Sequence, residues 1–151
     1  MFESLQRLFR HKPRTEIVWI DRDGEFSRSP GQAVYPSLPG HAFDLDGDLV
    51  LNGSDVRRLR RNLRVRGHLI LQDCAQLQEL PEGLLVGGDL ILRNCPRVRA
   101  LPPTLQVYGS VFLHTCPALE RLCGGARVGR DLLVANCPAL VAMEEGFLSS
   151  G

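Results

Sequence analysis

Four copies of a ten-residue block recur in this chain at a fixed interval of 21 residues, which limits the possible folds more than any other feature of the sequence. Each copy begins with valine and ends with cysteine, and the copies occupy residues 65–74, 86–95, 107–116 and 128–137. A degenerate copy precedes them, with Ser54 in the position of the cysteine. Because one such unit cannot bury its own apolar side, consecutive units must stack as the coils of a solenoid.

The spacing of apolar residues within a unit predicts strands, a bend and a short return. The apolar residues first alternate, as in Val86, Leu90 and Leu92 around Gly88, which is the period of a strand interrupted by a bend. After the cysteine the apolar spacing lengthens to three, which suits a tight return and not a helix. We therefore predict a mainly β fold, a short solenoid of about five coils of 20–21 residues whose last coil is incomplete.

Residues 69–81 resemble the leucine-rich repeat superfamily in its cysteine-bearing form, L-x-L-x-x-C-x-x-L-x-x-L-P. The resemblance extends over residues 43–148 and implies a right-handed, curved solenoid that binds other proteins. In this chain, however, a Val-x-Gly replaces the usual first leucine of the family, and no segment of helix length follows on the convex side. The alternation through Val-x-Gly-x-Leu-x-Leu is also similar to a parallel β-helix, including the self-assembling bactofilin type, so both cross-sections stay open.

The chain divides into an N-terminal cap, residues 1–42, and the solenoid, residues 43–151. The first dozen residues place apolar side chains at helical spacing and predict a short amphipathic helix. An Asp-Gly pair at 23–24 favours a two-residue turn, so residues 16–26 are predicted to form a β-hairpin that covers the first coil. Residues 27–42 are rich in turn-forming residues and predict a surface loop.

Composition and charge exclude several classes of protein. The net charge of +1 does not favour a general nucleic-acid binder. No segment approaches the ~18 consecutive apolar residues of a membrane span, and the first residues lack the apolar run of a secretory signal. We therefore expect a cytoplasmic location.

The cysteines of the repeat do not predict a metal site. Coils stacked about 4.8 Å apart would spread Cys74, Cys95, Cys116 and Cys137 along a row about 15 Å long, whereas zinc requires thiolates that converge at about 2.3 Å. The leucine-rich repeat resemblance implies that these cysteines point inward and satisfy the backbone of a turn. Cys123 takes a turn position that proline fills in two other coils, so we expect it to be more exposed.

No pattern of residues predicts catalysis or a cofactor. The acidic run Asp44–Asp48 resembles a calcium loop only superficially, because its glycine is misplaced for the twelve-residue loop. The four histidines are scattered, and no nucleophile, base and orienting group recur at a useful spacing. We expect a protein that is not an enzyme and that uses neither a metal nor another cofactor.

One set of residues is apolar where a solvated sheet would be polar. These residues lie between the two inward leucines of each predicted strand and must point outward, because strand side chains alternate between faces. They are Val50, Ile70, Ile91, Phe112 and Leu133, with a predicted polar edge at Gln72, Arg93 and His114. Large exposed apolar patches mark interfaces, so either a partner, including a second copy, or the N-terminal segment with Trp19 and Phe26 should cover the row.

Three functional hypotheses follow. The first is a non-catalytic protein–protein interaction scaffold that binds through this apolar strand face. The second is a self-assembling β-helix that polymerises through its open last coil. The third, ranked last, is binding of nucleic acid or a membrane surface by Arg57, Arg58, Arg60, Arg61, Arg64 and Arg66, which could equally form a solvated rim of the first coil.

Overall fold

The computed structural model describes residues 18–24, 26–27, 32–34, 44–45, 47–122, 124–140, 142–143 and 148–149. This part of the chain consists of short β-strands and the turns that join them, and the predicted mainly β solenoid is confirmed. The described residues contain no helix long and apolar enough to cross a membrane. The predicted amphipathic helix lies outside the described residues.

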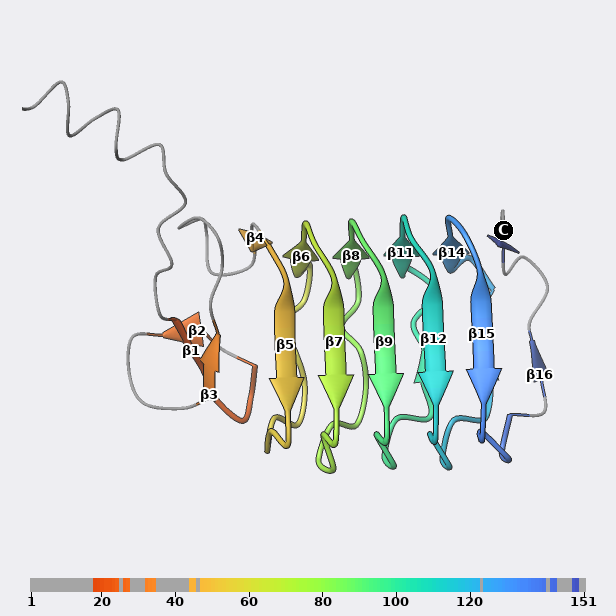
Figure 1. Cartoon of the computed structure of the whole chain (residues 1–151), viewed down its shortest axis with the longest axis horizontal. Coiled ribbons are helices and arrows are strands. Elements are labelled where there is room, and N and C mark those ends of the chain that lie inside the picture. The colour runs from red at the N-terminus through yellow and green to blue at the C-terminus, as the bar shows by residue number, and fades with distance from the viewer. Residues whose placement is uncertain are drawn as a thin grey trace, which may run out of the picture.

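The longest strands form a five-stranded parallel sheet with one strand from each coil (Figure 1). Each residue pairs with its repeat equivalent, as in Leu69 with Leu90 and Ile70 with Ile91. The predicted register is therefore confirmed, including the shorter interval of 20 residues between the first two coils. From the N-terminal end the strands are β5 (Leu49–Asn52), β7 (Leu69–Gln72), β9 (Leu90–Arg93), β12 (Val111–His114) and β15 (Leu132–Ala135).

Two further parallel sheets complete the cross-section of the solenoid. The bend before each long strand separates it from a strand of the second sheet: β4 (Asp44–Leu45), β6 (Arg64–Val65), β8 (Leu85–Val86), β11 (Gln106–Val107) and β14 (Arg127–Val128). A sixth strand of this sheet, β17 (Leu148–Ser149), pairs with β14. The return carries a third sheet: β10 (Ala100–Leu101), β13 (Arg121–Leu122) and β16 (Ala142–Met143). The return, predicted as a tight segment without a helix, thus contains strands, which are only two residues long and leave no alternating pattern in the sequence.

The N-terminal segment forms a small antiparallel sheet of β1 (Val18–Ile20), β2 (Phe26–Ser27) and β3 (Gln32–Val34). The pairing of β1 with β2 confirms the predicted hairpin. The prediction of a loop over residues 27–42 is wrong at Ser27 and at β3, which pairs with the other edge of β1. Three residues that include a glutamine and an alanine give no strand signal among turn-forming neighbours, so sequence reasoning missed β3.

The hairpin packs against the first coil. Ile20 is 2% exposed and joins the hydrophobic core of the solenoid. The Arg57 amide donates to the Arg22 carbonyl at 2.7 Å, and the Arg22 guanidinium lies 2.9 Å from the Asp55 carboxylate. At Gly24 the turn approaches so closely that an added Cβ would lie 2.2 Å from the Arg58 carbonyl oxygen. The predicted covering of the first coil is therefore present along this turn.

A ladder of side-chain acceptors links successive coils at the bend before each long strand. Asp48 Oδ1 accepts the His68 amide hydrogen at 2.7 Å, and His68 Nδ1 accepts that of Asp89 at 2.8 Å. Asp89 Oδ1 and Ser110 Oγ continue the ladder to the amides of Ser110 and Asp131. Since His68 Nδ1 accepts a hydrogen here, it holds a lone pair and does not form an ion pair with Asp89 Oδ2, 3.7 Å away.

The glycines at the bend leave room for this ladder. A Cβ added at Gly109 would lie 2.3 Å from Asp89 Oδ1 and 2.6 Å from the Gly88 carbonyl oxygen. In the following coil Arg130 occupies the equivalent position, and there the ladder residue beside it is the smaller Ser110. The residue at the bend is therefore matched to the size of the acceptor in the preceding coil.

Replacing Gly109 by alanine should lower the free energy of unfolding by about 1–3 kcal/mol, because the new methyl group displaces the Asp89 carboxylate and crowds the backbone. Chemical denaturation of Gly109→Ala measures the loss, with Arg130→Ala as the control at the equivalent position. Adding Asp89→Ser should recover part of the loss by copying the Ser110 pairing. Equal stability of Gly109→Ala and the parent chain would contradict the steric account.

Candidate interaction surface

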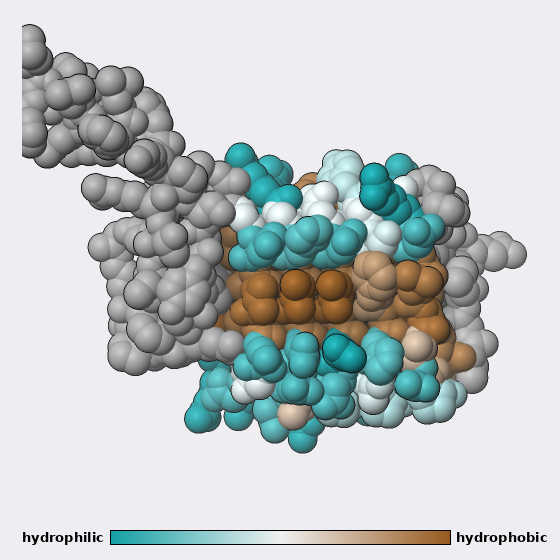
Figure 2. Space-filling view, viewed as in Figure 1, coloured by the Kyte–Doolittle hydropathy of each residue, from teal (hydrophilic) through white to brown (hydrophobic). Residues whose placement is uncertain are grey.

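The outward residues of the five-stranded sheet form one continuous apolar row, which we call the stripe. Its members occupy one register position of β5, β7, β9, β12 and β15: Val50, Ile70, Ile91, Phe112 and Leu133. Figure 2 shows the stripe as a brown band between two hydrophilic rows. The end members Val50 and Leu133 are 49% and 51% exposed, and the three between them are half-buried by their neighbours. The stripe therefore lies on the surface of the described protein.

A polar row borders the stripe on each side. The ladder row comprises Asp48, His68, Asp89, Ser110 and Asp131, and its side chains are occupied by the amides of the following coils as far as Ser110. The other row, which we call the C-terminal row, comprises Asn52, Gln72, Arg93, His114 and Ala135. It contains the predicted polar edge, so the structure places those three residues beside the stripe; their role in binding stays a prediction.

The central strand β9 carries opposite charges on the two sides of the stripe. Asp89 precedes the strand by one residue and Arg93 ends it, so each is two residues from Ile91, about 6.8 Å along the strand. Arg93 is exposed and has no ion-pair partner within the described ranges. Oδ2 of Asp89 accepts no hydrogen bond there, since Oδ1 alone receives the Ser110 amide. Both charges can therefore reach a partner that covers the stripe.

The described N-terminal sheet does not cover the stripe. Its strand β3 contacts β5, the first strand of the long sheet, yet Val50 on β5 stays half exposed. In Figure 1 β1, β2 and β3 stand at the N-terminal end of the solenoid and not in front of β7, β9 and β12. Trp19 and Phe26 belong to β1 and β2, so their backbone lies at that end as well. Their side chains lie outside the described structure.

The arginine-rich segment is not gathered on one surface. Arg64 belongs to β6 in the second sheet, whereas Arg58 forms a parallel bridge with Glu79 on the return. The Arg58 side chain lies 3.9 Å from the Asp23 carboxylate, and the Arg66 side chain lies 3.5 Å from that of Asp44. Arg58, Arg60 and Arg61 thus line one hollow at the corner of the first coil, whereas Arg64 lies apart from them in the second sheet.

The cysteines form the predicted row and are free thiols. Cys74, Cys95 and Cys116 are at most 1% exposed. Each donates from Sγ to a carbonyl oxygen of the preceding coil, on Leu51, Leu71 and Leu92, at 3.6, 3.5 and 3.8 Å respectively. Within the described ranges no three histidine, cysteine or acidic side chains come together as metal ligands. The row therefore satisfies backbone acceptors inside the core. Cys123 lies outside the described residues.

Burial and mutual contact control the ionisation of these thiols. Contact with Cys95 lowers the pKa of Cys74, and the same contact, together with burial, raises the pKa of Cys95. Burial raises the pKa of Cys116 from its ordinary value of 9.0 to about 11. Nucleophilic chemistry needs a thiolate, so Cys95 and Cys116 are poorly suited to it at neutral pH.

The residue before each cysteine of the row, and before Ser54 in the first coil, has a left-handed backbone, which sequence reasoning missed. The φ angles lie between 53° and 67° at Gly53, Asp73, Asn94, Thr115 and Asn136. Glycine, asparagine and aspartate are enriched in this region, and a β-branched threonine is unusual there. The signal was therefore present in the sequence as a column of turn-tolerant residues, and it ends each long strand at a fixed place.

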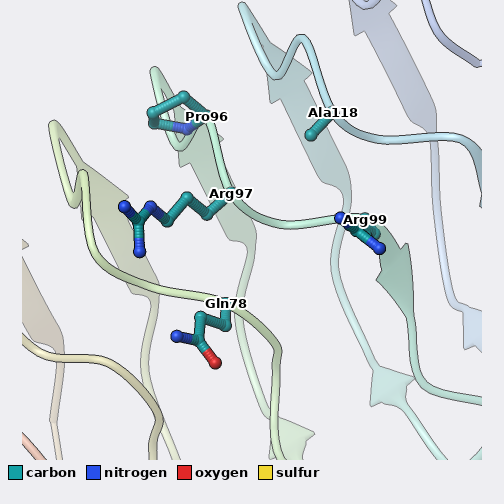
Figure 3. A pocket seen from close by; sticks show the side chains of 5 residues that line it. All are labelled: Gln78, Pro96, Arg97, Arg99 and Ala118. Atoms are coloured by element: carbon teal, nitrogen blue, oxygen red, sulfur yellow. The ribbon is translucent and has the colours of Figure 1, made fainter.

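The described part of the return face contains a shallow hollow. It is lined by residues from three successive coils: Gln78, then Pro96, Arg97 and Arg99, then Ala118 (Figure 3). A second hollow lies where Asp23 meets the corner at residues 58–62. Neither lining contains a histidine, cysteine or hydroxyl nucleophile, so the stripe is the strongest candidate for a functional surface.

Comparison of the chain with protein-family models, with curated proteins and with solved structures finds no match. The resemblance to leucine-rich repeats thus depends on the repeat pattern itself, and the three-sided arrangement of parallel sheets is a β-solenoid in the general sense.

The raised pKa of Cys116 predicts a loss of stability in alkaline solution. The folded state holds the thiol proton more tightly than the unfolded chain, so this contribution is complete below pH 9 and is lost as pH rises towards 11. The free energy of unfolding should fall by about 1–3 kcal/mol more in the parent chain than in Cys116→Ser between pH 8 and 11. Parallel pH profiles would contradict burial of this thiol.

Proposed function

We propose that this protein is a non-catalytic interaction scaffold that binds another protein through the stripe. The observation that carries the proposal is the uninterrupted row of five apolar side chains on the solvent side of the long sheet. Full burial of an isoleucine or phenylalanine side chain stabilises a protein by about 1.5–3 kcal/mol. Because the side chains of the stripe are only partly buried, covering them with a partner would contribute part of that energy to binding.

Packing within the sheet accounts for only part of this row. Neighbouring residues on parallel strands stabilise each other by about 0.2–1 kcal/mol a pair, which favours β-branched and aromatic side chains. Threonine is β-branched and would supply much of this packing without exposing a wholly apolar side chain. Because all five positions are apolar instead, selection for a covered surface explains the row better than selection for strand stability.

The two other hypotheses have weaker support. Head-to-tail polymerisation requires both ends of the solenoid to be open, and the described hairpin packs on the first coil through Ile20 and Gly24. Val134 is the inward residue of β15, the last long strand, at the position of Leu113 on β12. It is 41% exposed, so the inward row is less well covered there. Binding of anionic surfaces would require a common basic surface, whereas the arginines at 57–66 divide between the corner hollow and the second sheet.

Replacing Phe112 by glutamate should remove partner binding while preserving the fold, because the change places a charge in the middle of the stripe. Affinity purification from the native source, followed by identification of the retained protein and rebinding of that protein in purified form, measures the effect. We expect at least a tenfold loss of affinity. Tyr108→Glu is the matched control, since Tyr108 is 62% exposed in the same coil but lies off the stripe.

A second variant guards against a change that merely unfolds the chain. Ile91→Thr keeps a β-branched side chain on β9 and should leave the melting temperature within a few degrees of the parent value. It should nonetheless weaken the same complex. Unchanged binding by both folded stripe variants, or unfolding of both, would place the stripe outside the binding surface or inside the core and would refute the proposal.

A further inference from the structure

We propose that the partner of the stripe is a second copy of this chain, packed face to face so that the two-fold axis runs along the stripe. This inference rests on the proposed function, because it names the occupant of the same surface. Two sheets that pack in this way lie about 10 Å apart, and side chains from both faces fill the space between them. The arrangement of charges beside the stripe selects the direction of the axis.

An axis along the stripe reverses the strands and places each coil opposite its own equivalent. The ladder row of one copy then faces the C-terminal row of the other. Asp89 comes opposite Arg93, and Arg93 opposite Asp89, so the central coil contributes two ion pairs. In the coils on either side His68 meets Gln72 and Ser110 meets His114, so no like charges meet.

An axis parallel to the strands produces the opposite result. Each row of one copy then faces the same row of the other copy, and the two copies run in opposite order of coils. Asp89 would then face Asp89, Arg93 would face Arg93, and the end residues Asp48 and Asp131 would face each other. Juxtaposed like charges oppose association in an interface from which water is excluded. The same apolar stripe therefore supports one two-fold arrangement and opposes the other.

The side chains of the central coil are free to make these contacts. Arg93 is exposed at the end of β9 and has no ion-pair partner within the described ranges. Asp89 keeps Oδ2 available while Oδ1 holds the Ser110 amide, which also fixes the orientation of the carboxylate. An arginine spans about half of the 10 Å between two packed sheets, so the pair can close without distortion of either sheet.

The size of the surface predicts a weak dimer. Five strands about 4.8 Å apart make the stripe about 19 Å long, and the stripe together with its two bordering rows is about 14 Å wide. Such a face buries roughly 300–400 Å² on each copy, about half of what standard stable interfaces bury. We therefore expect a dissociation constant on the order of 10–100 μM.

Sedimentation velocity of the purified full chain tests the inference. The sedimenting mass should rise from 16.8 kDa towards twice that value as the concentration increases from about 1 μM to about 500 μM. Raising NaCl from about 50 to about 500 mM should weaken the dimer, because salt screens the two Asp89–Arg93 pairs. A dimer strengthened by salt would overturn the proposed axis, since screening would then be relieving like-charge repulsion.

Three variants locate the interface. Arg93→Glu should raise the dissociation constant at least about tenfold, because it opposes two carboxylates to two others. Arg97→Glu makes the same change of charge on the exposed return face and should leave the dimer unchanged. Phe112→Glu should abolish it. Equal effects of Arg93→Glu and Arg97→Glu would overturn the proposed pairing.

The outcomes separate this inference from the proposed function. A protein that stays monomeric to about 1 mM, while Phe112→Glu still loses a different identified partner, overturns the second copy as occupant and leaves the scaffold function standing. A dimer unaffected by Phe112→Glu and Ile91→Thr, together with unchanged binding of other proteins, overturns both.

Discussion

In-register stacking of coils by parallel backbone hydrogen bonds is the constraint on which every other feature of this structure depends. Each residue of β9 lies beside its equivalents in β7 and β12, so one choice of side chain becomes a row along the solenoid. An inward leucine such as Leu90 is buried by the same row above and below it. An outward residue such as Ile91 becomes part of a continuous surface feature. The repeat therefore determines which kind of side chain lines each face of the solenoid, more than it determines any single site.

Features were predictable from the sequence where the same type of residue recurs at the same position of each coil. The inward leucines, the cysteine row and the register of Ile70, Ile91 and Phe112 follow from a period that aligns similar side chains. The acceptor ladder escaped prediction because aspartate, histidine and serine share a hydrogen-bonding role and no common shape. Its accompanying glycines suggested only a bend, since nothing in the sequence shows what lies above them.

Local features outside the repeat were less predictable. The hairpin was visible because Asp23-Gly24 has a strong turn preference, but β3 has neither length nor alternation. The sequence leaves open whether the arginines at 57–66 form a basic patch or a solvated rim, because neighbours in sequence need not be neighbours in space. A coil turns its residues through three faces, so Arg58 and Arg64 face different sheets. Sequence proximity therefore says little about clustering in a solenoid.

The stripe is the one row that the fold itself does not require, and its availability in the dilute protein is the central claim. The chain has four isoleucines, of which Ile70 and Ile91 lie on the stripe and Ile20 is buried at 2% exposure. Solution NMR of isoleucine methyl groups with a soluble paramagnetic agent measures their access to solvent directly. We predict strong broadening at Ile70 and Ile91 and little at Ile20. Equal protection of all three in dilute protein would show that the chain covers its own stripe and would contradict the account.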